Sequence, residues 1–350
     1  MTVSRPAVVD IRLLPSDRAR PINPRSILSP TSPADSGRTT GLGDSIPLEQ
    51  LSVLVVTHER PAMLNELLES LVAIGGVRWA TVVVVDDSRE PLPTTGRFPG
   101  LSLRHLTLPD RVHITRAKNI GLASIKSPFV LIIDDDNTIT DTTLPRPLRR
   151  LAEEPRLGAL MPAVVYRDDP NLVWVYATPF APGRWGFELL GRNRPRDPAL
   201  EGRFLPTDAL PNAAVFRTAA LQSVDGYDER FPVNSSADLC QRLKRAGWLV
   251  EADSGAFVHH NVELPGRPGY WAAHAVTDPE RTYFEASDWF RLEFQIHRGQ
   301  WGVAWRALYH SGTWILPLLL ALVIRKGATR SATIAALVRG VRDGLRGSGG

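Results

Sequence analysis

Short runs of apolar residues, each ending in polar or acidic residues, recur along most of the chain. The clearest are Leu51–Val56, Thr81–Val85 and Pro128–Ile133. An uninterrupted apolar run, rather than an alternating one, is typical of a strand that is buried on both faces of a parallel sheet. Later strands are predicted at residues 159–166, 213–216 and 256–259.

Between these runs the spacing of apolar residues changes to that of a helix. Pro61 suits the first turn of a helix, and the apolar residues after it fall on one helical face: Leu64, Leu67, Leu68 and Leu71. Residues 115–124 also have a helical pattern. Strand, turn and helix therefore alternate, which predicts an α/β fold with a Pro- and Arg-rich loop at residues 179–211.

The two ends of the chain differ from this middle part. Residues 1–48 are rich in Pro, Ser, Arg and Gly and contain no aromatic residue, so we predict a disordered leader. The folded α/β domain is predicted to occupy residues 49–265. A helical extension is predicted for residues 266–350.

The extension combines an apolar run with a basic helical pattern. The run Trp314–Ile324 has about half of the ~20 residues that a membrane-spanning helix needs. After it, residues 325–346 hold six basic residues and one acid, and five apolar residues share one helical face: Ile334, Leu337, Val338, Val341 and Leu345. Such a helix suits a membrane interface, so residues 304–346 are predicted to bind a membrane surface. The alternative is a helix packed on the core with its basic side in water.

Composition narrows the functional classes. A net charge of +4 over 350 residues does not imply a surface for nucleic acid. One cysteine, Cys240, excludes an internal disulfide framework and a cysteine-rich zinc site. The first residues show no secretory signal. We therefore expect a cytoplasmic protein that lies peripherally on the cytoplasmic face of the membrane.

The strongest chemical feature is the triple acid Asp134, Asp135 and Asp136, directly after the run 128–133. Three adjacent carboxylates repel one another unless a cation lies between them. Ligands of parallel sheets gather at the carboxyl ends of the strands, and oxygen ligands suit Mg²⁺ or Mn²⁺ bound to phosphate oxygens. The triple acid therefore suggests a metal-bound phosphate compound. The alternative is a solvated acidic turn.

Several motifs follow one another in a fixed order, and this order resembles the inverting family 2 glycosyltransferases with the GT-A fold, a three-layer sandwich with a mostly parallel sheet. The resemblance covers residues 51 to about 262. The motifs that carry it are Thr57-His-Glu-Arg60, Asp86-Asp87-Ser88, Thr115 to Leu122, Leu131 to Asn137, Asn212 to Arg217, Val224 to Phe231, Asp238 to Trp248 and Ala256 to His260.

The resemblance assigns roles to particular residues. It implies a nucleoside diphosphate sugar as donor, with contacts at Thr57, Glu59 and Asp87 and at Arg116 and Asn119. Asp134 and Asp136 match the Asp-x-Asp motif that holds Mn²⁺ or Mg²⁺, and Asp135 would lie near the ribose or the metal. His260 matches the histidine that closes the metal site in many relatives.

The expected general base is the point at which this chain departs from the family pattern. Relatives carry Glu-Asp-x-Asp-Leu, whereas this chain reads Ser235-Ser236-Ala237-Asp238-Leu239. A serine is no general base near neutral pH, which leaves Asp238, or a nearby acid such as Asp228, to take the proton. The same residues also fit a helix-capping pattern, with Ser235 at the cap and Asp238 three residues later.

The function expected from the resemblance is transfer of a sugar, with inversion, to a hydroxyl of a membrane-associated or cell-envelope glycan or lipid acceptor. The two missing acids keep open a second hypothesis, a donor-binding but non-catalytic or regulatory protein. A third hypothesis is another nucleotide-using α/β enzyme. The turn at residues 57–64 contains no glycine, which argues against a dinucleotide fingerprint or a P-loop.

Overall fold

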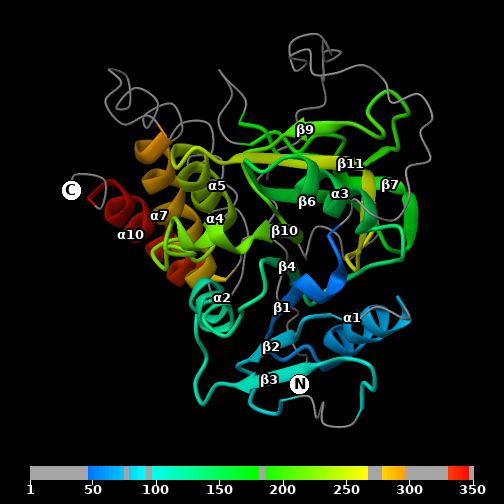
Figure 1. Cartoon of the computed structure of the whole chain (residues 1–350). Coiled ribbons are helices and arrows are strands. Elements are labelled where there is room, and N and C mark those ends of the chain that lie inside the picture. The colour runs from blue at the N-terminus through cyan, green and yellow to red at the C-terminus, as the bar shows by residue number, and fades with distance from the viewer. Residues whose placement is uncertain are drawn as a thin grey trace.

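The computed structural model describes residues 46–74, 79–91, 97–180, 187–266, 278–296 and 330–346. Most of the predicted leader and the whole apolar run at 314–324 lie outside the described residues. The described part is built around one large sheet with helices on both faces (Figure 1).

The sheet contains eleven strands, and its main path runs β3-β2-β1-β4-β10-β6-β11-β5. The strands are β1 (Leu51–Thr57), β2 (Val82–Asp86), β3 (Leu103–Thr107), β4 (Phe129–Asp134), β5 (Asn137–Thr138), β6 (Leu157–Tyr166), β7 (Asp169–Val175), β8 (Arg194–Pro195), β9 (Phe204–Pro206), β10 (Ala213–Arg217) and β11 (Leu249–His260). All six predicted strands are confirmed. The sequence pattern missed β3, β5, β7, β8 and β9, and it gave β11 too late a start.

The sheet is mixed but mostly parallel, as predicted: six of the eight strands on its main path run in one direction, and β10 and β5 run in the other. Of the pairings between these strands, four are parallel and six antiparallel. The parallel block is β3-β2-β1-β4, and β10 then lies antiparallel between β4 and β6. An apolar run shows that a strand is buried, but it does not show the strand's direction.

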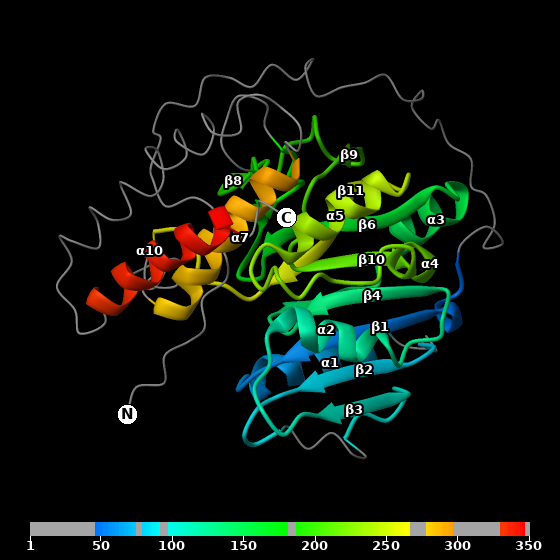
Figure 2. The same cartoon turned by 90° about the vertical axis from the view of Figure 1, so that its left-hand side faces the viewer.

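Helices cover both faces of the sheet, and the last two described helices form a separate pair beside them (Figures 1 and 2). The helices are α1 (Pro61–Ala73), α2 (Ile114–Leu122), α3 (Pro145–Glu153), α4 (Thr218–Gln222), α5 (Ser235–Arg245), α7 (Pro279–Ile296) and α10 (Arg330–Arg346), with a short 3-10 helix η2 (Leu48–Gln50). Successive residues of β1 point to opposite faces. Val53 and Val55 join the core under α1 and α3, whereas Leu54 joins the core under α2, α4 and α5 (Figures 1 and 2).

Helix α2 lies very close to the sheet because it carries Gly121. A Cβ atom at this position would be 2.2 Å from Cδ1 of Leu54. The close approach brings the first turns of α2 to the ends of β1 and β4, where the triple acid lies.

The C-terminal helix α10 packs lengthwise on α7 (Figure 2). Its buried residues are Thr333, Ala336, Leu337, Gly340 and Gly344. A Cβ atom on Gly340 would lie 2.4 Å from the carbonyl oxygen of Tyr283. The helix itself is confirmed, but the face that packs is a row of mostly small residues rather than the predicted apolar face.

Part of the predicted apolar face of α10 lies outward. Val338 is 57% exposed and Leu345 is 42% exposed, whereas Leu337 is fully buried. Within the described residues, no helix combines the length and the apolar character that crossing a bilayer requires.

Replacing Gly340 by leucine should separate α10 from α7. The new side chain has no space against the Tyr283 carbonyl, so we expect a loss of about 1–3 kcal/mol in the free energy of unfolding, measured by chemical denaturation, and faster proteolysis of α10. Ala335→Leu on the exposed side of the same helix is the control, with a change within about 0.5 kcal/mol. Equal stability of the two variants would show that the close contact is not required.

Candidate functional site

A cavity of about 400 Å³ opens at the carboxyl ends of β1 and β4. One wall carries the triple acid together with Arg60 and Lys118. The opposite wall is formed by residues 232–237, which lead into α5, and by side chains from the first turns of α7. The parallel register places Val56 beside Asp134 and Thr57 beside Asp86, so the polar ends of three strands meet at this edge of the sheet.

Two protein cations balance the triple acid. The Nη1 atom of Arg60 lies 2.9 Å from Oδ1 of Asp135 and 3.1 Å from Oδ2 of Asp136. The Nζ atom of Lys118 lies 3.4 Å from Oδ1 of Asp134. The sequence analysis expected a cation among these acids but missed both side chains.

The positions of the two cations could have been found from the sequence. Arg60 belongs to the motif after β1, and the turn carries it toward β4. On α2, Lys118 is three residues after the buried Thr115 and three before the buried Gly121, so it shares their helical face. The predicted Arg116 is exposed and does not line the cavity.

The acids differ in their electrostatic surroundings. Burial raises the pKa of Asp135 to about 7, although Arg60 and the hydroxyl of Thr57, 2.7 Å away, act in the opposite direction. Burial would also raise the pKa of Asp136, but His260 and Arg60 outweigh it and the pKa is lowered. The neighbouring carboxylates hold the pKa of Lys118 above its ordinary value despite burial.

Glu59 and Asp87 hold two turns together at the ends of β1 and β2. Glu59 has a positive φ of 53°, its amide donates to Ser88 at 2.6 Å, and its carboxylate accepts the Arg89 amide at 3.0 Å. Asp87 accepts the Val112 amide at 2.8 Å. Glu59 and Asp87 were both predicted to contact the donor, but neither lines the cavity. Asp135 does line it, and it accepts a hydrogen bond from Thr57, the third predicted donor contact of this group.

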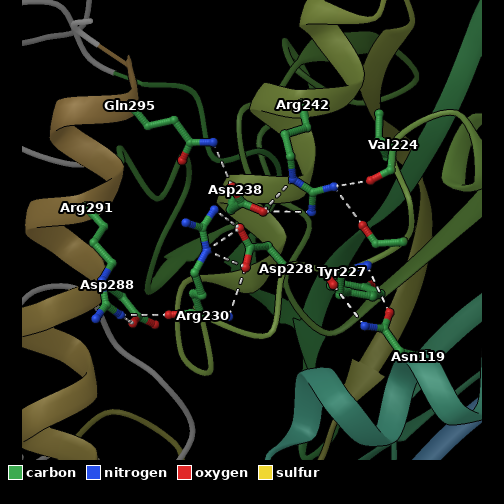
Figure 3. A network of polar contacts seen from close by, with 11 residues as sticks. Asn119, Val224, Tyr227, Asp228, Arg230, Asp238, Arg242, Asp288, Arg291 and Gln295 are labelled. Atoms are coloured by element: carbon green, nitrogen blue, oxygen red, sulfur yellow. Dashed lines mark hydrogen bonds and ion pairs between the residues drawn. The ribbon is translucent and has the colours of Figure 1, made fainter. Parts of the chain in front are cut away.

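Asn119 acts through Tyr227 rather than facing the cavity. Its Nδ2 donates to the Tyr227 carbonyl at 2.8 Å and its Oδ1 accepts the Tyr227 amide at 2.9 Å (Figure 3). Gly226 precedes this pair with φ +70°, and a Cβ atom there would lie 2.8 Å from Oδ1 of Asn119. The Tyr227 ring lines the cavity with Lys118 5.5 Å from its centre.

His260 reaches the acids although it is 124 residues away in sequence (260 minus 136). It ends β11, which pairs with β5 so that His260 lies opposite Asn137. Its Nε2 lies 3.6 Å from Oδ1 of Asp136. The ring is fully buried, and neither nitrogen has a hydrogen-bond partner among the described residues.

These residues fit a divalent metal that takes two ligands from the protein. Asp136 and the unsatisfied His260 are close together, and Mg²⁺ or Mn²⁺ commonly completes its shell with phosphate oxygens and water. Asp134, the third predicted ligand, points to Lys118 instead. Within the described residues, no group of three or more metal-ligating side chains is found.

Asp238 is not brought to the cavity. It is fully buried, its Oδ2 lies 2.8 Å from Nε of Arg242, and its Oδ1 lies 2.9 Å from Nε2 of Gln295 (Figure 3). The structure places it in this ion pair, so geometry does not support it as the base. The capping prediction was also wrong, because α5 begins at Ser235 after Asn234 and no side chain caps it.

Asp228, the other acid considered as base, is also engaged. It forms an ion pair with Arg230 at 2.7 Å. Burial works against ionisation, but the bonds from Arg230 outweigh it and lower the pKa of Asp228.

A comparison of sequences decides the family. Residues 52–222 match the sequence profile described as Glycosyl transferase family 2, and this range includes Thr57, Arg60, Lys118 and the triple acid. Residues 52–222, just under half of the chain, therefore carry a domain of glycosyl transferase family 2.

Relatives named as glycosyltransferases align with part of the chain. The pre-mycofactocin glycosyltransferase of Mycobacterium tuberculosis (strain H37Rv) is 26% identical over 214 residues, which are 60% of this chain and 42% of the relative. The uncharacterised glycosyltransferase YwdF of Bacillus subtilis (strain 168) is 25% identical over 105 residues, 30% of this chain and 38% of the relative. The chain thus spans about two fifths of the length of these relatives.

Solved structures share the fold. The mannosyltransferase PcManGT from Pyrobaculum calidifontis, in complex with GDP-Man and Mn²⁺, has a TM-score of 0.51 and 17% identity, covering 86% of this chain and 90% of its own. S. aureus TarS 1-349 in complex with UDP-GlcNAc has a TM-score of 0.52 and 17% identity, covering 84% and 81%. At this identity the likeness concerns the fold alone, which is that of GT-A glycosyltransferases.

Proposed function

We propose that this family 2 protein transfers a sugar from a nucleoside diphosphate sugar, with a divalent metal and with inversion, to a hydroxyl of a glycan or lipid acceptor. The observation that carries the proposal is the acid cluster at the cavity, where Arg60 contacts Asp135 and Asp136, Lys118 contacts Asp134, and the buried His260 lies 3.6 Å from Asp136. Carboxylates, an imidazole and two cations together suit a diphosphate with its metal. The names of the relatives and structural neighbours support the same chemistry.

Asp136 and His260 would hold the metal, which when bound neutralises charge on the departing diphosphate. Arg60 and Lys118 are placed to bind the diphosphate oxygens from the protein side, and a guanidinium can do so with two parallel hydrogen bonds. Thr57 fixes the orientation of Asp135 by its hydrogen bond, so that Asp135 can accept a hydroxyl of the donor. These contacts orient the donor for in-line attack.

The donor site can be tested by thermal shift with a panel of nucleoside diphosphates and their sugars, with Mn²⁺ or with chelator. We expect one nucleotide to stabilise the wild type only when metal is present, and Asp136→Ala to weaken its binding about tenfold or more. Asp141→Ala, which changes an exposed acid, is the control. Unchanged metal-dependent binding by folded Asp136→Ala would contradict the metal assignment.

A second candidate function is donor binding without catalysis. The observation that favours it is that Ser235 and Ser236 line the cavity, whereas Asp238 is bound to Arg242 and does not. The carboxylates on the α7 side of the cavity are Asp278, which caps α7 by accepting the Arg281 amide, and Glu280.

Ser236→Asp distinguishes the two functions. If the native site lacks its base, a carboxylate at this position should raise donor turnover about a hundredfold, since general bases commonly contribute that much. Ser236→Ala, which removes the hydroxyl without adding a carboxylate, is the control, and nucleotide release is the measurement. If the native protein turns over the donor and Ser236→Asp does not raise that rate, the non-catalytic function is excluded.

The proposed acceptor is associated with a membrane, and α10 supports this part of the proposal. Ile334, Val338, Val341 and Leu345 form a stripe, here called the outer stripe, at helical spacing along one flank of the face that packs on α7, with Val338 and Leu345 exposed and the other two half-buried. Arg339, Arg342 and Arg346 lie beside it and would attract anionic lipid.

Charges placed in the outer stripe should release the protein from anionic vesicles. We expect Val338→Asp and Leu345→Asp each to weaken binding to phosphatidylserine-containing vesicles by about tenfold in a sedimentation assay. Ala332→Asp makes the same charge change away from the stripe and is the control. Equal weakening by all three would indicate a general charge effect and would contradict docking through the stripe.

A further inference from the structure

Helix α7 contacts the wall of the cavity that faces the triple acid. Three of its polar side chains, Asp288, Arg291 and Gln295, recur at helical spacing and point to the segment 228–238 (Figure 3). Nη1 of Arg291 donates to the Arg230 carbonyl at 2.9 Å. Nε2 of Gln295 donates to Asp238 at 2.9 Å. The segment is therefore attached to α7 at several points along its length.

The central attachment is the carboxylate of Asp288. Its Oδ2 accepts the amide of Val233 at 2.8 Å and the amide of Asn234 at 3.1 Å. Asp288 is fully buried, and burial raises its pKa to about 7 although the two amides act in the opposite direction. Its Oδ1 also lies 3.8 Å from Nη1 of Arg291, one helical turn further along α7. Burying a carboxylate costs free energy. The two hydrogen bonds that it accepts from the backbone amides of Val233 and Asn234 offset this cost.

The residues that Asp288 holds come directly before the polar edge of the cavity. Asn234, Ser235 and Ser236 all line the cavity, and the first two are 7% and 6% exposed. The Asn234 side chain makes no capping hydrogen bond to α5. Helix α7 thus fixes the backbone of a segment whose residues line the same cavity as the triple acid.

We propose that α7 is a positioning element for the acceptor and that Asp288 sets the orientation of Asn234, Ser235 and Ser236 toward an acceptor hydroxyl. This inference rests on the proposed transfer function. The donor contacts lie on the other wall, so Asp288 affects where the acceptor binds and leaves donor binding unchanged. The ligand class is a neutral hydroxyl-bearing compound, because amide and hydroxyl side chains pair with hydroxyls in both directions.

Asp288→Ala and Asp288→Asn test this inference together. The alanine variant removes the acceptor of two amide hydrogens, whereas the asparagine variant keeps a carbonyl oxygen with two lone pairs. We expect hydrogen exchange of residues 232–237 to accelerate about tenfold or more in Asp288→Ala and to return toward the wild-type rate in Asp288→Asn. Tyr283→Phe, which removes a hydroxyl of α7 that bonds to Asp343 on α10, is the control and should leave this segment unchanged.

Kinetics complete the test. For Asp288→Ala we expect kcat for donor turnover, measured as nucleotide release with water as acceptor, to fall about tenfold while the donor KM stays within about twofold. Asp288→Asn should restore kcat. Unchanged exchange in Asp288→Ala, a donor KM that rises with the loss, or an asparagine variant as defective as the alanine variant would each overturn the proposal.

Two further measurements keep the outcome clear. If Asp288→Ala does not fold, Arg291→Ala is measured instead. It removes the hydrogen bond from α7 to the Arg230 carbonyl, and its side chain is partly exposed. Unchanged hydrogen exchange and unchanged kcat in Arg291→Ala would overturn the proposal. Nucleotide binding by the wild type is measured first. A wild type that binds no nucleotide contradicts the proposed function, while the exchange data still decide whether α7 positions the segment.

Discussion

Three adjacent carboxylates at the end of β4 impose a charge that the fold must balance. Asp135 and Asp136 are 4% and 6% exposed, and burying an unpaired charge costs several kcal/mol. Arg60 comes from the turn after β1 and Lys118 from α2, so both must lie beside the end of β4. The strand order β2-β1-β4 and the glycine contact of α2 with β1 provide this proximity. The charge balance and the topology of the first half therefore depend on each other.

The sequence was sufficient for the parts of the fold that local pattern determines. All six predicted strands exist, and the helix at Pro61 buries the four leucines that were named. The direction of β10 could not be predicted, because an apolar run is the same in either direction. Strand β3 was missed because two of its five residues are exposed, the other three are only partly buried, and it reads as Leu-Arg-His-Leu-Thr, with no continuous apolar run.

The structure brings some of the predicted site residues together and leaves others apart, for a related reason. Asp134, Asp135 and Asp136 follow a strong local signal, and family resemblance then brought in His260 from a distant strand. Asp238 has a local pattern that fits a helix cap, but its partners are Arg242 on the next turn and Gln295, 57 residues away. On α10, hydrophobicity indicated the outer stripe, whereas packing used small residues that allow the backbones of two helices to approach closely.

The two walls of the cavity have different origins in the chain. Thr57, Arg60, Lys118 and the triple acid lie within residues 52–222, the range that matches the family profile. The opposite wall comes from residues 232–237 and from α7, whose position depends in turn on α10 through Gly340 and Gly344. One scaffold can serve many acceptors if donor contacts and acceptor contacts are carried by separate segments. In this chain, the C-terminal helix pair is the segment that could change without disturbing the buried charges at the donor wall.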